Sequence, residues 1–255
     1  MIKKSIRESK SPPISDLLDV LAIAAWGILL LKYWLTEKLG LLVHPRYFWV
    51  SNVTGFVLLL IAVFKFWGLL RQQKTPMLKV QHLTLFPPGW TSWLLLLTAL
   101  LGLLITPRPL TISAATQQEL ADSFSSSRIK PQAFRSSVRS DERSLIDWVR
   151  TLAALPEPDL YTGQKVKVQG FAVHLPELPD QYLTITRFVI GHCALDAYPV
   201  GLPVQLTTSR QSYSPNTWLE VEGQMITEDL GGKRQLTIQA KSLKPIPEPK
   251  NPYEY

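Results

Sequence analysis

The chain has 255 residues, a formal net charge of +7 and a hydrophobic fraction of 46%. Its charge is uneven, because residues 1–140 carry 16 Lys and Arg against 6 Asp and Glu, whereas residues 141–255 carry 11 against 14. The basic excess belongs to the half that holds the long apolar runs, so we interpret it as a membrane-topology signal and expect no binding of nucleic acid. The single cysteine excludes an internal disulfide.

Three apolar runs occupy the first half of the chain. They cover residues 17–35, 52–70 and 90–106, and they approach the roughly 20 residues that a helix needs to cross a bilayer. A signal peptide is the alternative for the first run, but no small-residue cleavage site follows it. The sequence therefore predicts an α-helical membrane segment of three transmembrane helices within residues 1–110.

Basic residues around these runs predict the orientation. The tail before the first run carries Lys3, Lys4, Arg7 and Lys10, and the second loop carries Arg71, Lys74 and Lys79. The first loop has only Lys38 and Arg46. Because short cytoplasmic loops are enriched in Lys and Arg, we expect a cell-membrane protein with a cytoplasmic N-terminus and an extracytoplasmic C-terminal domain.

Charged residues inside the runs lie near their ends, as Asp19, Lys32 and Lys65 do. We therefore expect no charge pair between the spans, and three spans without an internal repeat do not predict a complete transporter. In the first loop, His44 and Arg46 are candidates for lining an entry path. The alternative is that Arg46 anchors this loop at the membrane interface.

The second half predicts a small all-β domain preceded by a short helix. A polar, Ser-rich linker is expected over residues 111–140, and the domain over residues 141–248. Apolar spacing predicts the helix over residues 144–153, with Ser140 or Asp141 as its cap. Alternation and runs of β-forming residues predict strands over residues 165–174, 182–190, 204–208, 218–227 and 235–243.

Five short strands predict an OB-like barrel, with a sandwich fragment as the alternative. Gly231-Gly232 indicates a hairpin between the last two strands. Four prolines precede the end of the sequence, so residues 249–255 are expected to form a flexible tail.

Candidate chemistry gathers around the only cysteine. His192, Cys193 and Asp196 are ligand types for zinc, and His174 is a candidate fourth ligand. The alternative is that Cys193 packs as a small apolar residue while Asp196 caps a turn. A nucleophilic Cys193 is not favoured, because no oriented base accompanies it, so we expect no enzymatic activity.

Arg187 stands among apolar residues of a predicted strand. It either faces solvent or pairs with a carboxylate, and we favour a pairing with Asp196 because a guanidinium fork fits a carboxylate.

Four motifs carry a family resemblance. They are Tyr161-x-Gly163-x-x-Val166-x-Val168-x-Gly170-Phe171, Arg187-Phe188-Val189-Ile190, Asp196-Ala197-x-Pro199-Val200-Gly201-Leu202 and Trp218-x-x-Val221-x-Gly223. Together they resemble the YcgQ-like family of bacterial permease subunits, and His44-Pro45-Arg46 resembles the loop after that family's first span. The family has two adjacent cysteines where this chain has His192-Cys193.

The resemblance implies a membrane segment followed by an OB-like domain, with a separate multi-span permease subunit as partner. We therefore predict a membrane-anchored accessory subunit of a two-component permease, in contact with membrane lipid, whose outer domain binds or gates substrate. The candidate functional residues are Arg187, His192, Cys193, Asp196, His44 and Arg46. The alternatives are a surface module that binds or delivers a metal such as zinc, and a cell-envelope interaction protein without a small ligand.

Overall fold

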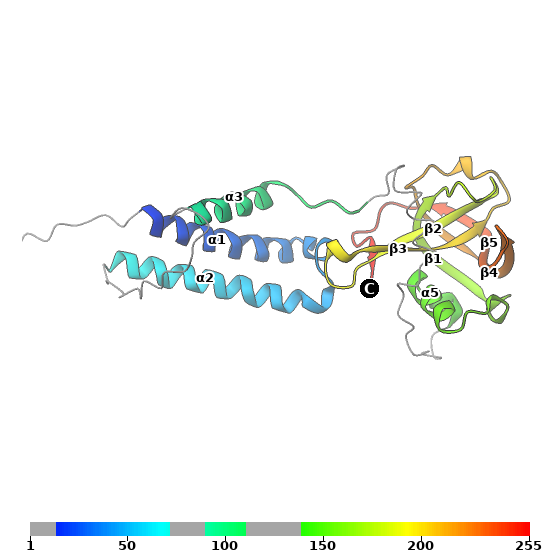
Figure 1. Ribbon diagram of the computed structural model, residues 1–255, viewed down its shortest axis with the longest axis horizontal. Coiled ribbons are helices and arrows are strands. Elements are labelled where there is room, and N and C mark those ends of the chain that lie inside the picture. Colours follow the sequence, from blue (N-terminus) through cyan, green and yellow to red (C-terminus); the bar gives the residue numbers. More distant parts are fainter. Residues whose placement is uncertain (1–13, 72–89, 111–138) are drawn as a thin grey trace, which may run out of the picture. The chain divides into compact units, whose positions relative to one another are not determined.

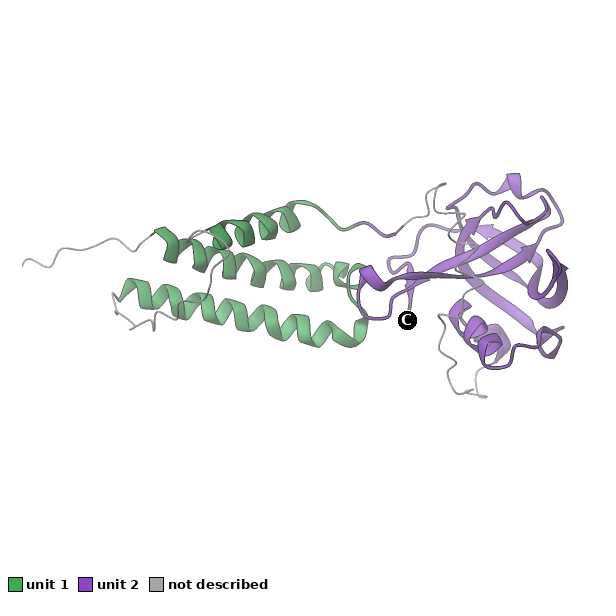
Figure 2. Ribbon diagram, viewed as in Figure 1, with its two compact units in different colours: residues 1–107 green, residues 108–255 purple. Residues whose placement is uncertain are grey.

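The computed structural model describes residues 14–71, 90–110 and 139–255, which belong to two compact units, Met1–Pro107 and Arg108–Tyr255 (Figures 1 and 2). The basic N-terminal tail, most of the second loop and nearly all of the predicted linker at 111–140 lie outside the described residues.

The first unit is helical, and each of the three apolar runs forms a helix. These helices are α1 (Ile14–Leu35), α2 (Phe48–Leu70) and α3 (Trp90–Leu104), with the short 3-10 helices η1 (Lys38–Leu41) and η2 (Pro45–Tyr47) between the first two. Within the described part of the chain, two helical stretches, Ile14–Leu35 and Pro45–Leu70, are long and apolar enough to cross a membrane. At 15 residues, α3 is shorter than the predicted span at 90–106.

Small residues let the first two helices approach each other closely. A Cβ atom added at Gly27 of α1 would lie 2.9 Å from the Leu59 side chain and 3.0 Å from the Gly55 carbonyl oxygen of α2. Close backbone approach at small residues is typical of helices that associate in lipid. The buried residues of the three helices include the small side chains of Ala22, Ala25, Ala62 and Ala99.

The second unit contains a six-stranded mixed sheet. Its strands are β1 (Lys165–Val173), β2 (Tyr182–Val189), β3 (Tyr198–Gln205), β4 (Trp218–Leu230), β5 (Lys233–Pro245) and β6 (Tyr253–Glu254). The first five pair in the closed cycle β1–β4–β5–β3–β2–β1, in which only β3 and β5 are parallel. Strand β6 adds in parallel to the end of β2.

One helix covers part of this sheet. The core cluster includes Val166 and Val168 from β1 together with Leu145 and Trp148 from α5 (Leu145–Ala154). Helix α5 begins at the buried Leu145, because the preceding Ser144 forms a capping box with Asp147. The predicted caps Ser140 and Asp141 instead belong to the 3-10 helix η4 (Ser140–Glu142).

The third strand and the end of the chain differ from the predictions. The third strand covers Tyr198–Gln205, not 204–208, and includes Pro199 and Pro203. Both prolines lie before the two residues at which β3 pairs with β5, so that ladder does not require their missing N–H groups. On the other side of β3 they lie opposite Phe188 and Thr184 of β2. The tail predicted to be flexible at 249–255 instead contains β6, because Tyr253 and Glu254 pair with β2.

One other local prediction, the hairpin at Gly231-Gly232, is confirmed. Leu230 pairs with Lys233 across Gly231-Gly232, and both glycines have positive φ angles of 63° and 76°. Two positive φ angles are what a tight two-residue hairpin turn requires, and glycine adopts them without a steric penalty.

Candidate functional site

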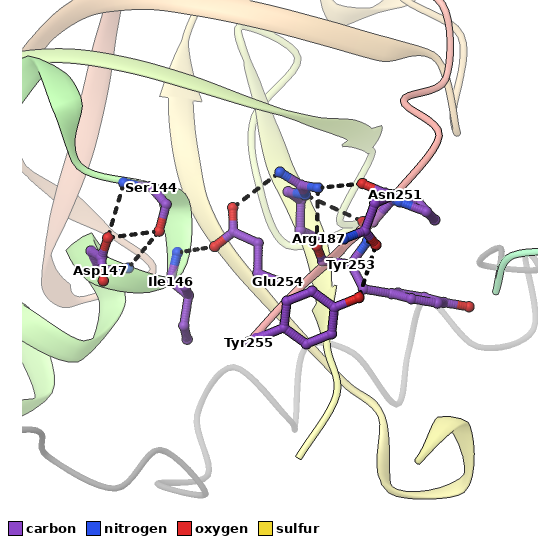
Figure 3. A network of polar contacts seen from close by, with 9 residues as sticks. Ser144, Ile146, Asp147, Arg187, Asn251, Tyr253, Glu254 and Tyr255 are labelled. Atoms are coloured by element: carbon purple, nitrogen blue, oxygen red, sulfur yellow. Dashed lines mark hydrogen bonds and ion pairs between the residues drawn. The ribbon is translucent and has the colours of Figure 1, made fainter. Parts of the chain in front are cut away.

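Arg187 lies on β2 and is mostly buried, with 14% of its side chain exposed. Its Nη1 donates to Glu254 Oε1 over 3.3 Å. Its other nitrogens donate to the main-chain oxygens of Asn251 at 3.0 Å, Pro252 at 3.2 Å and Tyr253 at 3.2 Å (Figure 3). The guanidinium therefore holds the segment 251–254 against β2, and we call this arrangement the C-terminal clamp.

Glu254 extends the clamp to the helix. Its side chain is only 7% exposed, and its second oxygen accepts a hydrogen bond of 2.6 Å from the Ile146 amide (Figure 3). This amide belongs to the first turn of α5, where N–H groups lack partners within the helix and a carboxylate is favoured. Arg150 adds a 3.0 Å hydrogen bond from α5 to the main-chain oxygen of Tyr255.

The clamp changes the interpretation of Arg187. Burial lowers the pKa of its guanidinium, and the nearby Glu254 carboxylate acts in the opposite direction. The group stays charged at neutral pH because its ordinary value is so high. The predicted pairing of Arg187 with Asp196 is wrong, since the partner is Glu254, a residue expected to lie in a frayed tail.

Asp196 organises the turn between β2 and β3. Its carboxylate accepts hydrogen bonds from the amides of Gly191 at 3.1 Å, His192 at 2.8 Å and Cys193 at 3.2 Å. The His192 Nδ1 atom lies 2.8 Å from the same carboxylate. We call residues 191–196 the Asp196 loop; the turn-capping alternative for Asp196 is confirmed.

These contacts determine the protonation of Asp196. Partial burial acts to raise the pKa of its carboxyl group, but the hydrogen bonds from His192 and the three amides outweigh that effect. The pKa is therefore lowered from its ordinary value, and the carboxylate is ionised at neutral pH. Cys193 is a free thiol of intermediate exposure.

The four predicted metal ligands are only partly brought together. His192 and Asp196 are in contact, whereas the surroundings of His174 are Tyr213, Arg210 and Asp180. Burial is the main cause that lowers the pKa of His174. Among the residues that the structure describes, no three His, Cys, Asp or Glu side chains are arranged to hold a metal ion. Zinc binding stays a prediction.

His44 and Arg46 lie in the loop between α1 and α2. His44 Nδ1 accepts a 3.0 Å hydrogen bond from the Arg46 amide and so caps the 3-10 helix η2. The His44 ring also makes an edge contact with Tyr47, with 6.2 Å between ring centroids. His44 therefore has a local structural role at this end of the helix pair.

Sequence reasoning missed a polar cluster among the three helices. Lys65 Nζ of α2 lies 2.6 Å from one carboxylate oxygen of Asp19 in α1, and Ser92 of α3 donates to the other. We call Asp19, Lys65 and Ser92 the interhelical cluster. The expectation that the spans lack a charge pair is wrong.

A signal for this pair was present in the sequence. Asp19 lies near the start of the first run and Lys65 near the end of the second. Two helices joined by a short loop are antiparallel, so these two positions fall at the same level of the bundle. The opposite charges at matching depth predict the pair.

Further polar side chains of α1 bond to main-chain oxygens of α3. Trp26 Nε1 donates to Leu95 over 3.0 Å, and Lys32 Nζ donates to Leu103 over 2.6 Å. The Tyr33 hydroxyl donates to Gly102. Together with Ser92, these bonds follow α1 and α3 along their shared length, so the two helices run parallel.

The comparison with known families concerns mainly the second unit. The model of the DUF1980 C-terminal domain family matches residues 120–255, which include every element from η4 to β6. No curated protein matches the chain at a significant level. Since the family model covers more than half of the sequence, the chain belongs to the DUF1980 C-terminal domain family.

Proposed function

We propose that this chain is the membrane-anchored accessory subunit of a two-component permease of the YcgQ-like kind, with its β unit outside the cytoplasm. The observation that carries the proposal is the distribution of side chains in the helical unit. Its polar groups pair among the helices, while large apolar side chains face outward along them. That is the reverse of the pattern of a water-soluble helical bundle.

Helix α2 illustrates this distribution. Phe56, Leu60 and Phe64 recur at four-residue spacing, and the Phe64 side chain is 62% exposed. A core helix of a soluble protein would bury such residues. These contacts also argue against a cleaved signal sequence for α1. Asp19 of this helix accepts hydrogen bonds from both α2 and α3, so α1 is part of the helical unit.

The third helix is included in the proposed membrane segment. Its 15 residues rise about 22 Å, which is shorter than the roughly 30 Å hydrocarbon core. Local bilayer thinning accommodates such a mismatch at modest cost. The parallel arrangement of α1 and α3 supports three crossings, which carry the chain from a cytoplasmic N-terminus to an outer β unit.

The strand pairing supports an OB-type barrel for the β unit. Strand β1 pairs with both β2 and β4, and β3 runs parallel to β5, which closes five strands on themselves. A five-stranded Greek-key barrel of the OB type uses such a closed sheet, whereas a sandwich fragment keeps two sheets apart.

Within this proposal, the outer unit binds the transported substrate or gates its access. Arg187 contributes by positioning the end of the chain rather than by contacting substrate. His192 and Cys193 lie on a turn that Asp196 fixes, so their side chains are presented on a defined backbone. Pre-ordered contact residues reduce the entropic cost of binding.

The test is co-purification of the full-length tagged protein from native membranes in mild detergent, followed by mass spectrometry. A polytopic permease recovered in a fixed ratio supports the proposal and identifies the transport system. Crosslinking before solubilisation controls for dissociation in detergent. Recovery of the chain alone after crosslinking contradicts the permease partnership.

A further inference from the structure

Leu195 is the most conspicuous apolar side chain of the described part of the β unit, because it is 98% exposed. It occupies the middle of the 3-10 helix η6 (Ala194–Asp196), at the tip of the Asp196 loop. The exposure of Leu195 does not result from a loosely held loop. Asp196 holds three of its amides, so the backbone presents the side chain in a fixed position.

The base of the loop adjoins the place where the chain enters the β unit. Strand β6 pairs with the last two residues of β2, and the Ile190 amide continues this pairing with a 3.1 Å bond to the Glu254 carbonyl. The Leu110 amide donates to the Tyr253 hydroxyl over 2.9 Å. Figure 2 shows the β2–β3 turn, the C-terminal residue and the first residues of this unit at the same end of it.

We propose that the Asp196 loop contacts the lipid surface and that Leu195 inserts into the boundary between headgroups and acyl chains. The inference rests on the proposed membrane location of α3. Leu110 lies only six positions after Leu104, the last residue of α3, and six extended residues span at most about 20 Å. The end of the β unit that carries Leu110 and the loop therefore stays within reach of the bilayer.

A lipid surface fits this feature better than a protein partner does. A stable protein interface buries about 800 Å² on each partner. One leucine on a narrow turn offers little of that area, but it suffices for shallow insertion alongside a tethering helix. Leu110, which is also exposed, adds apolar surface at the same end of the unit.

The test uses the full-length protein with one environment-sensitive fluorophore. Leu195→Cys is introduced in a Cys193→Ser background, so that the new cysteine is the only one, and it is labelled with the fluorophore NBD. The labelled protein is then reconstituted into phosphatidylcholine liposomes. The loop tolerates both changes, because Asp196 holds main-chain amides and the Leu195 side chain makes no buried contact. Spin-labelled lipid and iodide on both sides of the membrane serve as quenchers.

Leu160→Cys in the same background is the matched control. Leu160 is also an exposed leucine, at 59%, on the 3-10 helix η5 (Pro158–Tyr161). Its neighbour Thr162 contacts Thr227 over 3.1 Å, and Glu228 in turn contacts Gln205 at the far end of β3. The control therefore lies at the opposite end of the strands from the Asp196 loop.

We expect the probe at position 195 to be quenched by spin-labelled lipid several-fold more than the probe at position 160, and to be protected from iodide. Equal iodide quenching at both positions, in protein that floats with the liposomes, overturns the lipid contact and leaves the proposed membrane anchoring intact. Protein that fails to float overturns both. Protection of position 195 from both quenchers in the liposomes assigns the loop to a protein contact and also overturns the inference.

Discussion

At the scale of single residues, the Glu254 carboxylate is the acceptor that Arg187 and the Ile146 amide share. Both carboxylate oxygens are used, and the side chain is almost completely buried. Glutamine in its place keeps the shape but removes the negative charge. The Arg187 guanidinium would then remain buried beside a neutral amide, and an uncompensated buried charge is strongly destabilising.

We expect Glu254→Gln to lower the free energy of local opening of the C-terminal clamp by about 3 kcal/mol. This value is near the lower end for a broken buried ion pair, because three main-chain oxygens still accept hydrogen bonds from Arg187. That change corresponds to roughly 100-fold faster amide exchange at Ile146 and Ile190. Hydrogen–deuterium exchange of the full-length protein measures it. Glu248→Gln, an exposed change of the same kind, should leave exchange at both amides unaltered.

Asp196 makes the order of its loop depend on pH. The folded loop lowers the pKa of this carboxyl group below its ordinary value of 3.8, so the folded form binds protons less readily than a loosened one. The stabilisation is therefore fully present above that value and is lost as the pH falls through the lower, folded value. A spin label on the only cysteine, Cys193, reports this directly.

We expect the label to become more mobile as the pH falls below about 3.8 and to stay immobile above it. Asp196→Asn should give a mobile label at neutral pH with no step in the acid range, which separates this group from other carboxylates that titrate there. A wild-type label whose mobility is the same as that of the variant at pH 7 would contradict the role assigned to Asp196.

At the scale of secondary-structure elements, the interhelical cluster joins all three helices at one level. We expect a double-mutant cycle of Asp19→Asn and Lys65→Met to give a coupling free energy on the order of 1 kcal/mol, because polar contacts between helices in lipid are individually modest. Lys65→Met alone should cost most, since it leaves an unpaired carboxylate. Unfolding in mixed detergent micelles measures each variant.

Asp16→Asn is the control for this cycle, because it makes the same charge change on the same helix. Asp16 lies in the first turn of α1, and the cluster contacts belong to Asp19. Additive effects of the Asp19 and Lys65 substitutions, with a coupling free energy of zero, would show that the ion pair does not hold the helices together.

Elements with a strong internal signal were predictable from the sequence. The apolar runs form helices, and β1 and β2 lie within one residue of the ranges that were predicted for them. The start of β3 was not predictable, because Pro199 and Pro203 are unfavourable in a strand by themselves and take their places by pairing with β2. Strand β6 has only two residues, too few for any period to be recognised, and it is ordered by contacts from residues far away in the sequence.

The candidate site follows the same division. The local turn of Asp196 was predictable, since it caps amides three to five residues earlier. The partner of Arg187 was not, because Glu254 is 67 residues away and no local pattern connects them. The pair between Asp19 and Lys65 lies between these cases, as helix directions would have predicted it.

At the scale of the whole molecule, the proposed topology places the single cysteine outside the cytoplasm. We expect a membrane-impermeant maleimide to label Cys193 in intact cells, because the thiol is partly exposed. Cys193→Ser is the negative control. A second control, Cys193→Ser with Ser5→Cys, should react only after permeabilisation. The reverse pattern of the two variants would place the β unit in the cytoplasm and contradict the assignment from basic residues.

The C-terminal clamp also has a consequence for the order in which the chain is made. Arg187 leaves the ribosome 67 residues before Glu254, and Ile146 leaves it 108 residues before. Protein synthesis adds about 5–20 residues per second, so several seconds pass before Glu254 is made. The five strands of the closed cycle are completed in this time, while the Arg187 guanidinium has no carboxylate partner and the Ile146 amide has no acceptor. We therefore expect the newly synthesised β unit to lack the C-terminal clamp, and to be open to proteases and chaperones, until residues 251–255 have been made.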